Sequence, residues 1–296
     1  MILRLVCSWF VVLSTGIVPV AIQNPRERSI LVTVLDQAGA PVRDVKPADL
    51  AVSEDGATRE VIDVKPAADP LTIALLVDMT TPTMGVEAPT QQLRTGLTTF
   101  VKTIQGASPE SQIGLWEFAG AAVQTVKFTA KTEDLTKKIQ RMFPTKQSGG
   151  VLLEALVDAS KELAKKAGHR RVIVSVSFNS PEVSAIEPKL VAEAVGRAGG
   201  SFWAISIQSN ATASTSSQGS TPTREVILDN VTARTGGRRL TGVSAVALEA
   251  QLKSIADALL SQYELTYVRP AGAPDAARID PVSRRGAKVL MTPWMR

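Results

Sequence analysis

The apolar run over residues 71–77 ends in Asp78, and this feature constrains the fold most strongly. The segment reads LTIALLVD and is followed by MTTPTM over residues 79–84, a stretch rich in hydroxyl groups. A short apolar run of this kind is typical of a strand buried on both faces of a parallel sheet. In open α/β sheets, ligands bind at the carboxyl ends of the strands, so we expect the functional site near Asp78.

Strand-like and helix-like segments alternate from residue 71 to residue 261. Two adjacent strands are predicted over 111–129 with a turn at 119–121, and single strands at 170–177, 199–207 and 238–240. Helices are predicted over 89–105, 131–143, 151–167, 186–198, 223–235 and 243–261. This alternation predicts a doubly wound α/β domain over residues 70–261, with a mostly parallel sheet and helices on both faces.

Two β-rich segments flank this domain. Residues 24–66 contain an alternating strand at 30–36 and an Asp55–Gly56 turn between two short strands. Residues 262–296 return to β structure after the last predicted helix. We expect these two segments to pair into one small β-sandwich, with the α/β domain inserted between them.

The first 23 residues predict export. Arg4 precedes a long apolar run, which is the pattern of a secretory signal peptide; an uncleaved membrane anchor is the alternative. Cys7 is the only cysteine and lies inside this segment, so the mature chain has no disulfide and no cysteine metal site. We therefore predict a secreted or periplasmic protein.

Charge and motifs exclude several functions. The net charge is +5, but the basic residues are scattered and cluster only at helix ends, so we expect no nucleic-acid partner and no membrane contact beyond the N-terminal segment. His169 is the only histidine and precedes the strand at 170–177, which places it at the sheet edge opposite Asp78. No Gly-x-Ser-x-Gly elbow, His-Glu-x-x-His motif or phosphate loop is present. We therefore expect no enzyme, and a hydrolase is the weaker alternative.

Three sequence motifs together resemble a group of secreted bacterial proteins with a von Willebrand factor A-related domain. They are Ser53-Glu54-Asp55-Gly56, the strand that ends at Asp78, and the tail Gln262-Tyr263-Glu264-Leu265-Thr266-Tyr267. The resemblance covers most of the mature chain and implies the same α/β fold. In that family the strand ends form a metal-ion-dependent adhesion site, in which hydroxyls and carboxylates bind Mg²⁺ and one position stays open for an acidic residue of a partner.

This chain departs from the family pattern at most ligand positions. Asp78 and Thr80 match the first aspartate and the first serine, but Pro82 replaces the second serine. The threonine of the second loop falls at Gly150 or Val151, and the aspartate of the third loop falls at Phe178. Asp78 and Thr80 are therefore the remaining candidate metal ligands, and we expect a degenerate site without a cofactor. A metal-dependent (Mg²⁺) adhesion module would need substitute ligands from Thr81, Thr83, Ser148, Asn179 or Ser180.

We therefore expect a non-enzymatic, adhesion-type module that binds an unidentified protein through the loops near 78–86, 146–151 and 178–184. The candidate contact residues are Asp78, Met79, Thr80, Thr81, Met84, Ser148, Gly150, Phe178 and Asn179. Two purely structural alternatives remain for these residues: Phe178 packs in the core, and Asp78 caps nearby backbone N–H groups. A purely structural protein of the envelope is a further alternative.

Overall fold

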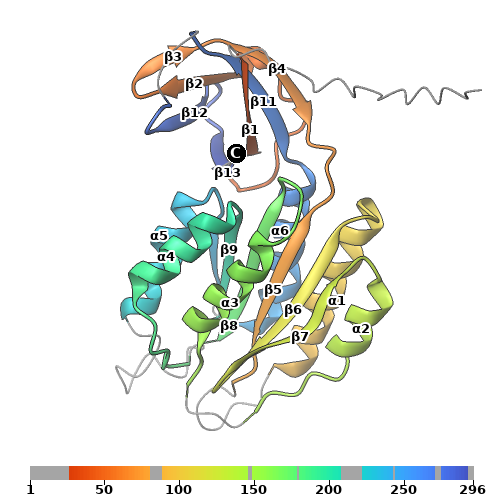
Figure 1. The fold of residues 1–296 in the computed structure, drawn as a ribbon. Helices are drawn as coiled ribbons and strands as arrows, with labels where there is room; N and C mark the ends of the chain where they lie inside the picture. Colours follow the sequence, from red (N-terminus) through yellow and green to blue (C-terminus); the bar gives the residue numbers. More distant parts are fainter. Residues whose placement is uncertain are drawn as a thin grey trace, which may run out of the picture.

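The computed structural model describes residues 27–80, 89–145, 149–178, 180–207, 222–242, 244–270 and 275–292. The predicted signal peptide and most of the Ser/Thr-rich segment 209–223 lie outside these residues. A β domain sits at one end of an α/β domain, and the two are joined by two crossings of the chain (Figure 1). No helix in the described part of the chain has both the length and the apolar character to span a bilayer.

The α/β domain is built on a six-stranded sheet with the order β10-β9-β8-β5-β6-β7. Neighbouring strands are parallel except for β7, which is antiparallel to β6. The strands are β5 (Thr72–Asp78), β6 (Gln112–Phe118), β7 (Ala122–Thr129), β8 (Arg171–Phe178), β9 (Ser201–Ile207) and β10 (Arg239–Gly242). The predicted doubly wound fold is confirmed.

Helices cover both faces of this sheet (Figure 1). They are α1 (Thr90–Ala107), α2 (Thr132–Ile139), α3 (Leu152–Ala164), α4 (Pro188–Ala198), α5 (Pro222–Arg234) and α6 (Leu248–Leu260). Side chains alternate along β5, so Leu75 packs with α1, α2 and α6, whereas Leu76 packs with α3, α4 and α5. The central strand is therefore buried on both faces, as its apolar sequence predicts.

Two predicted helices are shorter than expected. The helix expected over 131–143 ends at Ile139, in line with the presence of Pro144, which disfavours helical backbone at the residue before it. The helix expected over 243–261 begins at Leu248, because Ala245–Ala247 form a 3-10 turn whose cap is the Ser244 side chain.

The β domain combines both ends of the described chain. Its strands are β1 (Glu27–Leu35), β2 (Leu50–Glu54), β3 (Ala57–Arg59), β4 (Val61–Pro66), β11 (Tyr263–Val268), β12 (Ile279–Ser283) and β13 (Lys288–Thr292). They form a four-stranded sheet, β13-β1-β11-β4, and a three-stranded sheet, β12-β2-β3, around a shared core. The predicted pairing of the two β segments is confirmed.

The motif residues of the two β segments make the contacts that join them. The Tyr267 hydroxyl donates to Glu54 Oε1 at 2.7 Å, and the Asp55 carboxylate accepts the backbone N–H groups of residues 277 and 278. Asp55 and Gly56 both adopt positive φ angles, 47° and 87°, which the tight turn between β2 and β3 requires. The motifs therefore specify the β domain, and they carry no direct information about the opposite end of the α/β domain.

Arg170 fixes the two chain crossings between the domains. Its side chain donates to the carbonyls of Ala67 and Asp69 in the first crossing, at 3.0 and 2.6 Å. It also donates to the carbonyl of Leu259 at 2.5 Å and to Gln262 Oε1 at 3.3 Å in the second crossing. Arg170 is 5% exposed, and burial lowers its pKa to about 10, so it stays charged near neutral pH.

Arg170→Ala should lower the free energy of unfolding by about 3 kcal/mol or more, because it leaves several buried acceptors without a donor. Arg238→Ala is the matched control. Arg238 also crosses between the domains, but it makes one long hydrogen bond to the Gly39 carbonyl at 3.4 Å, so its loss should cost less than about 1 kcal/mol. Urea unfolding measures both values, and equal losses would contradict the special role of Arg170.

Candidate functional site

The Asp78 carboxylate is fully buried at the carboxyl end of β5 and accepts four hydrogen bonds. Oδ1 accepts the backbone N–H of Thr80 at 2.9 Å and the Thr80 hydroxyl at 2.6 Å. Oδ2 accepts the backbone N–H of Phe178 at 3.0 Å and the Ser180 hydroxyl at 3.2 Å. An ionised carboxylate has about four acceptor positions, so these donors use all of them. These contacts agree with the alternative in which Asp78 caps nearby backbone N–H groups.

A buried arginine supplies the counter-charge of Asp78. Arg224 lies in the first turn of α5, and its side chain is 1% exposed. One terminal nitrogen lies 3.8 Å from Asp78 Oδ2, and the other donates to the Ser180 carbonyl at 2.9 Å. The guanidinium thus links the end of β5 and the loop after β8 to the start of α5.

Glu182 is a second carboxylate beside this arginine. Its Oε2 lies 3.9 Å from Arg224 Nε and accepts no hydrogen bond from the described part of the chain, while Oε1 accepts the Ser184 hydroxyl at 2.5 Å. The Glu182 side chain is 3% exposed. Burial raises the pKa of Glu182, and the bond from Ser184 and the Arg224 charge oppose that rise. Burial likewise raises the pKa of Asp78, against the attraction of Arg224 and the bonds from Thr80 and Phe178.

The segment between α2 and α3 runs across the ends of β5 and β8. Thr145 pairs with Thr80 beyond β5, and Gly150 pairs with Glu182 beyond β8. Gly149 permits this close approach, since a Cβ atom there would lie 2.9 Å from the Pro181 carbonyl oxygen. The described parts of the three loops predicted to form the site therefore meet at one edge of the sheet.

Several predicted contact residues do not face solvent. Met79 and Phe178 are 3% and 5% exposed and belong to the hydrophobic core below the sheet edge, so their side chains are not available as contact residues, and the alternative in which Phe178 packs in the core describes its place. Asp78, Thr80 and Gly150 are also buried. Thr81, Met84, Ser148 and Asn179 lie outside the described residues, as do Pro82 and Thr83.

The described residues do not fit a divalent cation. All four acceptor positions of Asp78 are used, and Thr80 points its hydroxyl hydrogen at the same carboxylate. A doubly charged ion about 4 Å from the Arg224 guanidinium would be repelled by roughly 8 kcal/mol at an effective dielectric constant of about 20. No cluster of three or more His, Cys, Asp or Glu side chains that could hold a metal occurs among the described residues.

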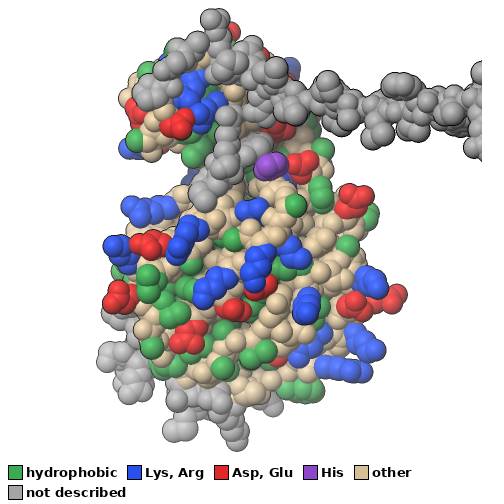
Figure 2. Space-filling view, in the orientation of Figure 1, with side chains coloured by type: hydrophobic (Ala, Val, Ile, Leu, Met, Phe, Trp, Pro, Cys, Tyr) green, Lys and Arg blue, Asp and Glu red, His purple; other side chains and the backbone are tan. Residues whose placement is uncertain are grey.

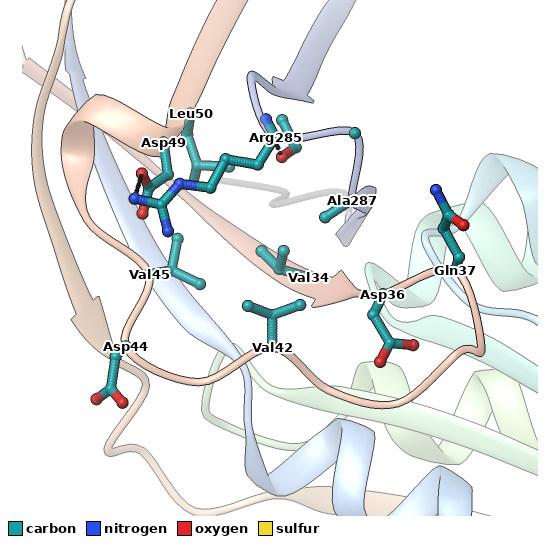
Figure 3. A pocket seen from close by; sticks show the side chains of 12 residues that line it. Val34, Asp36, Gln37, Val42, Asp44, Val45, Asp49, Leu50, Arg285 and Ala287 are labelled. Atoms are coloured by element: carbon teal, nitrogen blue, oxygen red, sulfur yellow. Dashed lines mark hydrogen bonds and ion pairs between the residues drawn. The ribbon is translucent and has the colours of Figure 1, made fainter.

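Two hollows lie elsewhere in the molecule. One, in the β domain, has valine walls and an Asp49–Arg285 ion pair of 2.7 Å at its rim (Figure 3). Its volume of about 190 Å³ is below the roughly 300 Å³ of an ordinary small-molecule site. The other, of about 420 Å³, includes His169 at the amino edge of the sheet, and none of the described residues that line it is a serine or a cysteine. Asp78 lies about 20 Å from this hollow, the length of a strand, so His169 and Asp78 do not lie together in one hydrolase site.

Comparisons with known proteins identify the fold. A scan against protein-family models gives no match, and no curated protein matches the chain significantly. Among solved structures, the von Willebrand factor type A protein from Catenulispora acidiphila has a TM-score of 0.53 at 9% identity, over 93% of this chain and 76% of that one. The chain has the von Willebrand factor A fold.

A second structure with this fold contains a metal. Proximal thread matrix protein 1 from the mussel byssus, solved with a zinc-occupied metal-ion-dependent adhesion site, has a TM-score of 0.53 at 14% identity. The match covers 70% of this chain and 49% of the mussel protein, so the chain spans about half the length of that relative. At these identities the likeness concerns the von Willebrand factor A fold alone.

Sequence reasoning missed Arg224 and Glu182. Arginine is normally exposed, and its local sequence, Pro222-Thr223-Arg224-Glu225, looks like an ordinary helix start. The available signal was weak: a cation in the first turn of a helix opposes the helix dipole, so it needs another partner. The predicted absence of most metal ligands around Asp78 was the second hint, because a buried carboxylate still needs a counter-charge.

Glu182→Gln should change how stability depends on pH. A raised pKa in the folded state adds stability that is present below about pH 4.5, the ordinary value, and is lost as the pH rises through the raised pKa. The unfolding free energy of the wild type minus that of Glu182→Gln should therefore fall between pH 4 and pH 8, by about 1.4 kcal/mol for each unit of the shift.

Urea unfolding at several pH values measures this difference. Glu187→Gln, which alters an exposed carboxylate of the same loop, serves as the matched control. If the unfolding free energy of the wild type minus that of Glu182→Gln grows with pH, burial is not the main influence on the pKa of Glu182. Attraction to Arg224 then outweighs it.

Proposed function

We propose that the chain is a non-enzymatic protein-binding module of the bacterial envelope or exterior, and that it binds its partner at the carboxyl edge of the sheet without a bridging metal ion. The N-terminal segment of residues 1–23, with its signal-peptide pattern, supports the location. The von Willebrand factor A fold is compatible with such a role, since adhesion modules use this edge.

The distribution of exposed apolar side chains carries the proposal. Eight large hydrophobic side chains are exposed among the described residues, and Ile62 and Val282 belong to the β domain. The other six all lie on segments at the carboxyl edge of the α/β sheet. They are Val123, Phe143, Val183, Leu190, Val226 and Val246. Apolar side chains concentrated at one end of a domain are typical of a protein-binding surface.

Phe143 is the most suitable anchor in this surface. Its side chain is 68% exposed, yet the Arg94 guanidinium stacks over the ring at 4.3 Å and donates two hydrogen bonds to the neighbouring Met142 carbonyl. An aromatic ring that is exposed but held in place loses little conformational entropy on binding. Basic side chains are spread over the face of the α/β domain seen in Figure 2, with acidic side chains among them, and those near this surface supply a polar margin for the same contact.

A photo-crosslinking residue placed at position 143 or 183 tests the proposal. In cells that secrete the chain, both positions should crosslink to the same protein partner, and position 282 in the β domain should not. The exposed fractions of Val183 and Val282, 54% and 52%, make position 282 a matched control. EDTA should leave the crosslinks unchanged, because no metal bridges the contact.

Either of two results would contradict the proposed function. Equal crosslinking from position 282 would show that the carboxyl edge is not the binding surface. A crosslink that EDTA abolishes and Mg²⁺ restores would revive a metal-dependent adhesion mechanism.

A further inference from the structure

We propose that the Arg224 guanidinium supplies the positive charge at the carboxyl ends of β5 and β8, where a bound metal ion would otherwise supply it. We call it the resident cation, because it belongs to the chain and cannot dissociate as a metal ion can. This inference rests on the metal independence of the proposed function. It names Arg224 as the residue that makes this edge independent of metal. It also gives α5 a role, because this helix places the cation at the ends of β5 and β8.

The guanidinium sits in a shell of oxygen atoms. Its polar neighbours are Asp78 Oδ2 at 3.8 Å, Glu182 Oε2 at 3.9 Å, and the carbonyl oxygens of Ser180 and Phe178 at 2.9 and 3.5 Å. All three guanidinium nitrogens take part in these contacts. Carboxylate and carbonyl oxygens are also the donors that hard cations select, so the site keeps the chemistry of a cation site with a different cation.

Burial makes this pairing obligatory. Arg224 and Asp78 are 1% and 0% exposed, so water does not solvate either charge. A buried charge is tolerated only when an opposite charge and hydrogen bonds compensate it. Removal of one partner therefore leaves the other uncompensated, whereas removal of both relieves the imbalance.

The place of Arg224 in its helix supports the same role. A positive side chain in the first turn of α5 opposes the helix dipole, which favours anions there. The two carboxylates from neighbouring loops offset this effect and bring the start of α5 to the sheet edge. The two carboxylates, which need a positive counter-charge, therefore explain why an arginine occupies this position, and the stability of the helix does not.

Thermal unfolding of a set of variants of the full chain tests the proposal. Arg224→Met should lower Tm by roughly 10 °C, because it breaks a buried ion pair in a chain of this size. Adding Asp78→Asn to that variant should recover part of the lost Tm, since it removes the uncompensated carboxylate. Arg234→Met, on the exposed side of the same helix, is the matched control and should leave Tm nearly unchanged.

Chemical complementation supplies a second readout. Guanidinium chloride at about 10 mM, far below denaturing concentrations, should raise the Tm of Arg224→Ala by several degrees relative to equal sodium chloride, and should leave the wild type unchanged. An equal response of the two proteins would count against a guanidinium site. If the Arg224 variants fail to fold alone, their recovery of folding in combination with Asp78→Asn still supports the pair.

Two failures can be told apart. A wild-type Tm that rises with millimolar Mg²⁺ or Mn²⁺, with no such rise in Asp78→Ala, would overturn metal independence and the resident cation together. If the wild type ignores these ions but the effects of Arg224→Met and Asp78→Asn simply add, the proposed function stands and the resident cation is refuted.

Discussion

The buried Asp78–Arg224 pair is the interaction on which the carboxyl edge of this molecule depends. The central strand delivers a carboxylate to a place that side chains from both sheet faces seal from water. Such a group needs a cation, donors, or both. Thr80, Phe178 and Ser180 provide the donors, and Arg224 provides the charge from the first turn of α5. Side chains and backbone groups of the chain itself thereby compensate the buried carboxylate.

A second buried arginine organises the opposite edge of the sheet. Arg170 receives its partners from the two chain crossings, so it ties the β domain to the α/β domain. Arg170 thus fixes the end of the α/β domain that adjoins the β domain (Figure 1), and Arg224 lies at the opposite end, where six large apolar side chains are exposed. A rigid support behind the proposed binding edge would reduce the ordering cost of docking a partner.

Much of the fold could be predicted because burial patterns are local. The apolar run before Asp78 and the helical spacing of Leu93, Leu97 and Phe100 specify elements within a few residues. The Asp55–Gly56 turn was equally readable, since its backbone needs positive φ. The pairing of the two terminal β segments was inferred from the return to β structure near the C-terminus, and the observed pairing of β1 with β11 agrees.

The chemistry of the edge was less predictable because it depends on distant partners. Arg224 meets Asp78 across 146 positions of sequence, and no spacing rule reports such a contact. Met79 and Phe178 were named as contact residues, with core packing kept as an alternative for Phe178. Both follow or end buried strands, and the side chain of each turns back into the core that those strands form. By contrast, the prediction of a degenerate metal site from Pro82 and Phe178 needed only residue identity, and it stays a prediction.

The most direct test of the central claim is a crystal structure of the protein grown with millimolar MnCl₂, with anomalous differences collected for manganese. The account predicts the Arg224 guanidinium between Asp78 and Glu182, with no manganese peak near the Asp78 carboxylate. A manganese peak about 2 Å from an Asp78 oxygen, with Arg224 turned away, would contradict it.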